Sequence, residues 1–97
     1  MVDYGKPDLD DCSYLLWVMA ELDYCAAFRY LKQFHAVVTA FRDRIAQVGP
    51  ERLQFTAKEK RQWVAICQAA LTETKHETLA QHRAKIVAFW TAYQEKN

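Results

Sequence analysis

The sequence predicts an all-α fold, a small four-helix bundle that forms one domain over residues 1–97. Its two glycines and two prolines are Gly5, Pro7, Gly49 and Pro50. Residues 8–48 and 51–97 therefore contain no helix breaker, and both are rich in Ala, Leu, Gln, Glu, Lys and Arg. Neither stretch has hairpin dipeptides or a sustained alternation of apolar and polar residues. The Gly49-Pro50 pair thus separates two helical halves.

The first half divides near Asp23. In residues 28–48 the apolar side chains share one helical face and the polar ones share the opposite face, which is typical of an amphipathic helix. Extended backward, the apolar face meets the carboxylate of Asp23, which is costly in such a stripe. We therefore expect Asp23 to be the N-cap of a helix over 24–48. The preceding helix, over 9–22, is apolar nearly all round its middle.

The second half begins with a capping-box pattern at Thr56 and Glu59, and Thr74 and Glu77 form a second such pattern. The apolar faces before and after the second box would differ by about 130° on one straight helix. A single helix cannot direct both faces at one core. The sequence therefore predicts helices over 57–72 and 75–95.

Charge is distributed unevenly along the chain, although the formal net charge is only +1. Residues 1–24 carry six acidic side chains and one lysine, a net of −5. Residues 25–97 carry twelve basic and six acidic side chains, a net of +6. The acidic end can pack on the basic body of its own chain or of a second copy, and we expect a two-fold homodimer. A net charge this small does not demand a nucleic-acid partner.

Targeting and redox features predict a cytoplasmic protein. The N-terminus is acidic and lacks the basic-then-apolar order of a secretory signal. No apolar run approaches the length of a membrane span, so we expect no membrane association. The three cysteines, Cys12, Cys25 and Cys67, are odd in number and widely spaced, as expected for reduced thiols.

No group of residues predicts catalysis, a metal site or a cofactor, so we expect a non-enzymatic protein. His76 and His82 are six residues apart, whereas two metal ligands on one helix face need i, i+4 spacing. His82 is expected to be buried with one hydrogen-bond partner, and His35 to be solvated. Cys67 lies among apolar residues and Cys25 near the expected start of the second helix, and we expect both to be packing residues.

Aromatic side chains carry the strongest functional signal. Three Trp, five Tyr and five Phe are many for a domain of this size, which buries only about 65% of its surface. The first helix is apolar in every direction, so either the other three helices wrap it or part of it is a partner surface. We predict a partner surface. It comprises one face of the first helix and an aromatic cluster of the last: Tyr14, Trp17, Val18, Glu21, Phe89, Trp90 and Tyr93.

These features predict a small regulatory protein that binds a partner protein through an aromatic helix face and blocks what normally binds there. Inhibitors, anti-activators and adaptors take this form, including small regulators from phages and mobile elements, which is an analogy of class alone. Two alternatives stay open. One is a structural subunit of a larger assembly. The other is a nucleic-acid-binding regulator with a helix-turn-helix-like second half and a basic start to the third helix, at Arg52, Lys58, Lys60 and Arg61.

Overall fold

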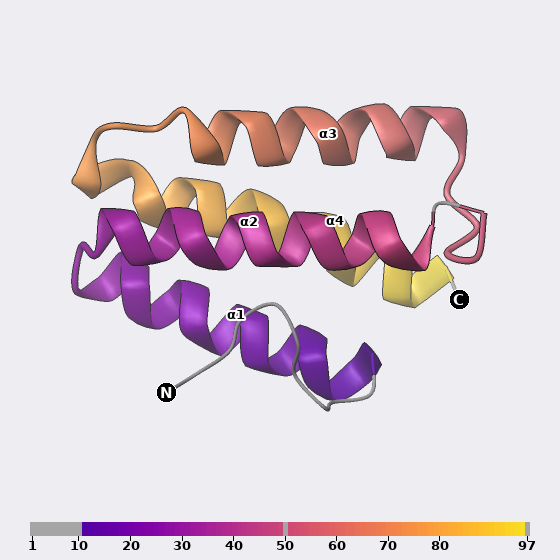
Figure 1. Cartoon of the computed structure of the whole chain (residues 1–97), viewed down its shortest axis with the longest axis horizontal. Coiled ribbons are helices and arrows are strands. Elements are labelled where there is room, and N and C mark those ends of the chain that lie inside the picture. Colours follow the sequence, from indigo (N-terminus) through magenta and orange to yellow (C-terminus); the bar gives the residue numbers. More distant parts are fainter. Residues whose placement is uncertain (1–10, 50, 97) are drawn as a thin grey trace.

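The computed structural model describes residues 11–49 and 51–96, which form four α-helices and one short 3-10 turn (Figure 1). The elements are α1 Asp11–Ala27, α2 Leu31–Val48, α3 Ala57–Leu71, η1 His76–Thr78 and α4 Leu79–Lys96. The described residues contain no strand. The predicted all-α, four-helix fold is therefore confirmed.

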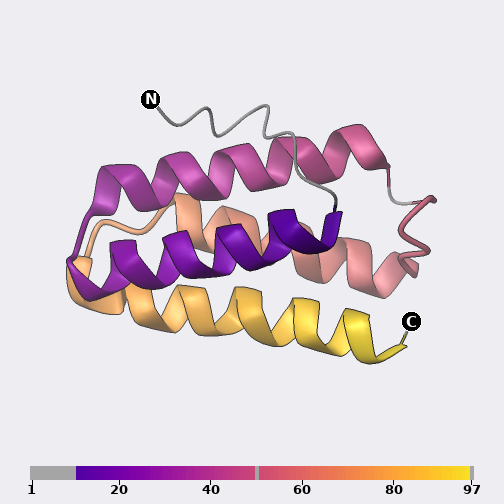
Figure 2. The same cartoon turned by 90° about the horizontal axis from the view of Figure 1, so that it is seen from below.

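Successive helices run in opposite directions, and each lies against two neighbours (Figures 1 and 2). Helix α1 packs on α2 and α4, and α3 packs on the same two helices, so α1 and α3 occupy opposite corners. Short connections between antiparallel neighbours are typical of up-down bundles. Helix α1 is therefore one corner of the bundle and is not wrapped by the other three helices, which leaves part of its surface open to solvent.

Aromatic rings fill the centre of the core. Phe41 on α2 is fully buried, and its ring centroid lies 5.0 Å from that of Trp63 on α3 and 5.3 Å from that of Trp90 on α4. The same ring lies 6.0 Å from that of Tyr14 on α1. These pairs meet edge-on or tilted, as aromatic quadrupoles favour. One side chain of α2 thus joins the inward faces of all four helices.

The first two helices do not divide at Asp23, so this boundary prediction is wrong. Helix α1 continues through Asp23, which is exposed, with Oδ1 3.6 Å from Nε of Arg83 on α4. The buried face of α1 continues past this point because of residues at i, i+4 and i+7 spacing, Val18, Leu22 and Cys25. The carboxylate lies off that face, and so it needs no new helix to keep it out of the core.

The break between α3 and α4 falls where the sequence predicts it, but the second capping box does not form. The 3-10 turn follows Lys75 without a side-chain cap. The backbone N–H of Thr74 instead donates to Oε2 of Glu73 at 3.1 Å. Glu73 also lies 3.4 Å from His82 on α4. The carboxylate of Glu73 therefore holds this connection, and the predicted pair of Thr74 and Glu77 does not.

The first capping box forms as predicted at the start of α3. Oγ1 of Thr56 accepts a hydrogen bond from the N–H of Glu59 at 3.1 Å, and Oε1 of Glu59 accepts one from the N–H of Thr56 at 2.9 Å. We expect Thr56→Ala to lower the free energy of unfolding by about 1 kcal/mol, because an N–H of the first turn loses its partner. Urea denaturation followed by circular dichroism measures this change. Thr74→Ala is the matched control, and an equal loss from both variants would contradict the assignment.

Candidate functional site

The residues predicted to form a partner surface lie mostly inside the bundle. Tyr14 and Val18 on α1 and Trp90 on α4 are buried in the core, so their predicted surface position is wrong. The other four are half-buried: Trp17, Glu21, Phe89 and Tyr93. The rings of Phe89 and Tyr93 lie against Phe55, with centroid distances of 5.6 and 5.5 Å. The ring of Trp17 lies against Tyr14 on its own helix, with a centroid distance of 5.7 Å. Since α1 is apolar all round, its periodicity did not distinguish the buried face from the exposed one.

At the start of α3 the basic side chains are exposed, whereas the nearby aromatic side chains are not. Its four predicted residues are all exposed: Arg52, Lys58, Lys60 and Arg61. The aromatic side chains closest to them in sequence, Phe55 and Trp63, turn inward, with ring centroids 5.6 and 5.4 Å from that of Phe89. Helices α3 and α4 also run antiparallel and side by side (Figures 1 and 2), whereas the helices of a helix-turn-helix cross steeply. This geometry does not favour a stacking platform or a reading helix here.

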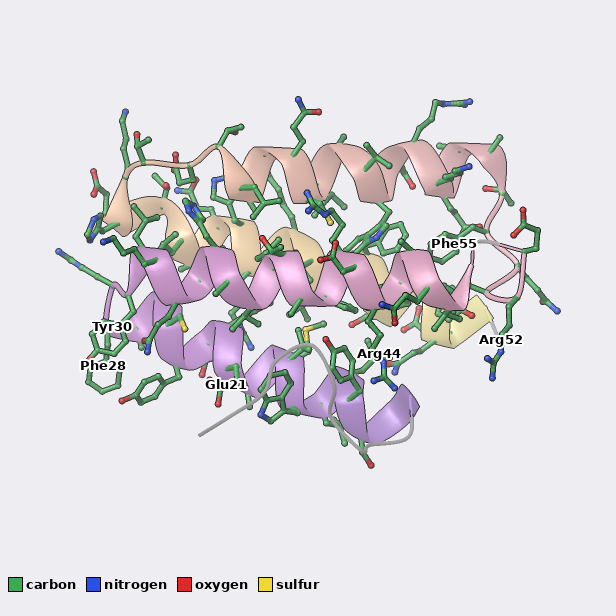
Figure 3. The ribbon with its side chains drawn as sticks, in the orientation of Figure 1. Glu21, Phe28, Tyr30, Arg44, Arg52 and Phe55 are labelled. Carbon is green, nitrogen blue, oxygen red and sulfur yellow. The ribbon has the colours of Figure 1, made fainter. Side chains whose placement is uncertain are left out.

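The exposed aromatic surface lies instead where α1 meets α2 (Figure 3). Tyr24, Phe28 and Tyr30 are 51%, 58% and 43% exposed. Their ring centroids are 4.8 Å apart for Tyr24 and Phe28, 5.8 Å for Tyr24 and Tyr30, and 6.0 Å for Phe28 and Tyr30. The three rings therefore form one contiguous patch, which we call the aromatic corner.

The end of α1 shapes this corner through a Schellman motif. The N–H of Tyr30 donates to the carbonyl of Cys25 at 2.8 Å. The N–H of Arg29 donates to the carbonyl of Ala26 at 3.3 Å. Arg29 has a φ of 59°, a position where glycine is the usual residue. The contact between Tyr30 and Tyr24 is the apolar contact that commonly accompanies this motif, whereas the motif makes no demand on residue 28.

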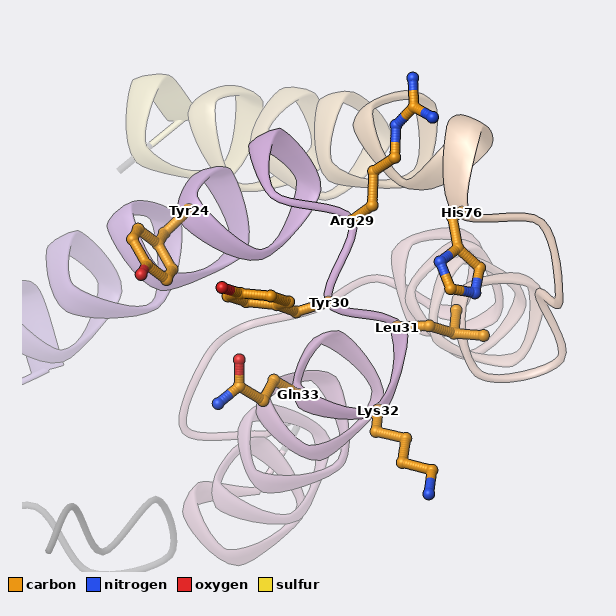
Figure 4. Close-up of a pocket in the computed structure, with 7 residues that line it drawn as sticks. All are labelled: Tyr24, Arg29, Tyr30, Leu31, Lys32, Gln33 and His76. Carbon is orange, nitrogen blue, oxygen red and sulfur yellow. The ribbon is translucent and has the colours of Figure 1, made fainter.

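A shallow depression of about 720 Å³ lies beside the aromatic corner (Figure 4). Its lining residues come from α1, α2, their connection and η1: Tyr24, Arg29, Tyr30, Leu31, Lys32, Gln33 and His76. Two of them, Arg29 and Lys32, are cations, and none of the lining residues within 11–49 and 51–96 is acidic. The depression thus combines apolar rings with positive charge, which fits a ligand that has an apolar group flanked by acidic groups.

Sequence reasoning missed the corner because of the error at Asp23. A helix that began there placed Tyr30 within the apolar stripe of a long second helix, and so assigned it to the core. The available signal was the i, i+4 spacing of Tyr24 and Phe28 at the end of an apolar helix. The left-handed residue that ends α1 had no such signal, since arginine rarely adopts that conformation.

His82 and His35 are both partly buried by neighbouring residues. His82 is half-buried and pairs with Glu73, close to the expected arrangement. Burial raises the pKa of the Glu73 carboxyl. Hydrogen bonds from Thr74 N–H and His82 lower this pKa by more than burial raises it, so the pKa lies below its ordinary value. His35 is half-buried with Nε2 enclosed, so its predicted solvation is wrong. Residues 11–49 and 51–96 contain no group of three or more potential metal ligands.

Cys25 and Cys67 are buried free thiols. Burial raises the pKa of Cys67 to about 12. Burial also raises the pKa of Cys25, and the charge of Glu21 raises it further. Cys25 lies within α1 and not at the start of a helix, where a thiolate would be stabilised. Both thiols are therefore poor nucleophiles, in line with the packing role expected for them.

Comparison with known families, curated proteins and solved structures finds no match. Among the described residues, no helix has both the length and the apolar character needed to cross a bilayer. The geometry of this chain alone therefore points to a site, and the aromatic corner is the candidate that it favours.

Proposed function

We propose that this protein is a small non-enzymatic regulator that binds another protein through the aromatic corner. The observation that carries the proposal is the exposure of three mutually packed rings at one end of the bundle. Exposed apolar patches mark interaction sites, and aromatic residues supply much of the binding energy at the centre of protein interfaces. Binding at the corner would cover a docking segment of the partner, which is how an inhibitor, anti-activator or adaptor acts.

The backbone at Arg29 supports this proposal. A left-handed conformation costs a non-glycine residue about 1–2 kcal/mol, and glycine would avoid that cost. Residues held in such conformations cluster at binding sites and active sites. The side chain of Arg29 lines the depression beside the rings. A contact between this guanidinium and a partner would explain why arginine occupies a position that favours glycine.

The charges around the corner indicate the chemistry of the partner. Arg29 and Lys32 line the depression with no acidic side chain among the described lining residues, so we propose a partner segment with an apolar side chain flanked by Asp or Glu. Single-stranded nucleic acid is the other occupant that rings and cations attract. The rings of Tyr24 and Phe28 already pack on each other at 4.8 Å, which leaves less ring face for stacked bases. This contact favours a protein partner.

The test compares two truncations of exposed side chains. We expect Phe28→Ala to weaken binding to the partner at least about thirtyfold, the usual loss for a central aromatic residue, with little change in thermal stability. Val64→Ala on α3 removes an equally exposed apolar side chain (56%) and should bind normally. Capture from source lysate with quantitative mass spectrometry, followed by titration of the captured protein, measures both. Equal binding by Phe28→Ala, or capture that nuclease treatment abolishes, would refute the proposal.

Arg29→Gly separates binding from folding in the same assay. We expect this variant to be more stable by up to about 1 kcal/mol, because glycine removes the strain at positive φ. We expect it also to bind the partner more weakly, because the guanidinium is lost. A variant that is stabilised and still binds normally would show that Arg29 has no part in the interface. If the partner is a second copy, as the predicted homodimer requires, light scattering reports the same differences as a change in mass.

A further inference from the structure

The face of α1 that points away from the bundle is uncharged along most of its length. Helix α1 lies nearest the viewer in Figure 2, with no other described helix in front of it. At about 100° per residue, five exposed side chains of this helix share an arc of about 80°. They are Ser13, Leu16, Ala20, Tyr24 and Ala27, which we call the outer stripe. None of the five is charged, and Leu16 is 69% exposed.

The neighbouring helices expose residues of a different kind. The exposed side chains of α2 include Lys32, and those of α3 include Lys58. Helix α1 contains neither lysine nor arginine. The exposed carboxylate of Asp23 borders the outer stripe, with Oδ1 3.6 Å from Nε of Arg83 on α4. Since the solvated face of a helix normally carries charge, an uncharged stripe of this length indicates a surface that another chain covers.

The outer stripe has the same spacing in both directions along the helix. Its successive members are 3, 4, 4 and 3 residues apart, with Ala20 at the centre. A two-fold axis through Ala20 therefore aligns the stripe with that of a second, antiparallel α1, as a two-fold interface requires. Leu16 of one copy then faces Tyr24 of the other, and Ala20 faces its own counterpart. Small residues at the centre and at both ends allow the two helix axes to approach to about 8 Å.

Charge favours the antiparallel arrangement of two copies. In the sequence, Asp8 and Asp10 precede α1, Asp11 begins it, and Arg29 and Lys32 follow its end. Antiparallel helices bring the acidic start of each copy to the basic end of the other, whereas parallel helices bring like charges together. Arg29 and Lys32 line a depression with no acidic side chain among its described lining residues. A second copy would supply the missing negative charge.

We propose that a second copy of this chain binds the outer stripe and forms an antiparallel two-fold dimer centred on Ala20. The interface lies on the side of α1 opposite its buried residues Tyr14 and Val18. It adjoins the aromatic corner at Tyr24, but it does not rest on the proposed function, because the purified chain forms it without another partner. Either proposal can therefore fail without the other.

The test measures the mass of the purified full chain by light scattering and its dissociation constant by analytical ultracentrifugation. We expect a dimer at tens of micromolar. Ala20→Glu places two carboxylates at the two-fold axis and should raise the dissociation constant at least about a hundredfold. Ala65→Glu is the matched control, since it adds the same charge at an exposed position on α3, the opposite corner of the bundle. The control should dimerise normally, and thermal melts check that both variants fold.

A mixture of oppositely charged variants tests whether residue 20 faces its own counterpart. Ala20→Lys alone should be monomeric, like Ala20→Glu, whereas an equimolar mixture should form a dimer with one copy of each, because opposite charges then meet at the axis. If a charged variant does not fold, Leu16→Ala replaces it and should weaken association at least about tenfold. A wild-type chain that stays monomeric at tens of micromolar would overturn the proposal. Dimers that survive these substitutions, or a folded mixture that does not associate, would overturn it as well.

Discussion

Phe41→Ala should unfold a large part of the protein at room temperature. The Phe41 ring contacts the core rings of the other three helices, at Tyr14, Trp63 and Trp90. Truncating a buried phenylalanine costs about 3–5 kcal/mol, which approaches the whole stability of many small domains. The melting temperature should fall by about 12–40 °C, given that 1 kcal/mol shifts it by about 4–8 °C at this size. Thermal melts followed by circular dichroism measure the fall.

The matched control for this prediction is Phe28→Ala, which removes the same atoms from the surface. Phe28 is 58% exposed, so its truncation should change the free energy of unfolding by no more than about 0.5 kcal/mol. A loss from Phe28→Ala as large as that from Phe41→Ala would mean that the aromatic corner is part of the core. That result would contradict both the described packing and the proposed binding surface.

Cys67 should react with a disulfide reagent about a thousandfold more slowly in the folded protein than in the unfolded chain at pH 8. Its pKa is raised from 9.0 to about 12, and only the thiolate attacks a disulfide. Each tenfold change in the thiolate fraction corresponds to a change of one in the pKa, so this rise makes the fraction about a thousandfold smaller. Burial also limits access of the reagent, since the side chain is 2% exposed.

A variant with Cys12→Ser and Cys25→Ala isolates the Cys67 thiol for this measurement. Its labelling should be slow in buffer and fast in denaturant. The raised pKa also predicts how stability depends on pH. Above pH 9 the unfolded chain ionises its thiol and the folded chain does not, so stability should fall as the pH rises from 9 toward 12. Fast labelling of the folded protein would contradict the burial of Cys67.

Features that depend on neighbouring residues could be predicted from the sequence. The capping box at Thr56 joins groups three residues apart, so its formation depends little on the rest of the fold. Gly49 ends α2 with a φ of 95°, a conformation that few residues other than glycine adopt. The break before α4 followed from a change of phase between two apolar faces. Each of these signals is complete within a few turns of helix.

The end of α1 shows where local signals fail. Arg29 adopts a left-handed conformation that its side chain disfavours, so the turn had no marker in the sequence. The apolar residues on both sides of Asp23 fitted one long stripe equally well. The turn is stabilised by the packing of the flanking helices on each other, which exceeds the local cost at Arg29. The aromatic corner depends on that turn and was therefore missed.

The amino-acid sequence by itself determined the helical class, the number of helices and the helix ends at Val48, Ala57, Leu71 and Lys96, because helix formation and capping are local. The end of α1 and the starts of α2 and α4 lie four to seven residues beyond the predicted positions. Only the tertiary structure decided which side of α1 is buried, since an all-round apolar helix has no direction of its own and packs wherever its neighbours lie. Packing against α2 and α4 buried Tyr14 and left Tyr24 exposed on the same helix. The aromatic corner needs Tyr30 beside Tyr24 and Phe28, and these contacts depend on the turn between α1 and α2, which no pattern within a single helix encodes.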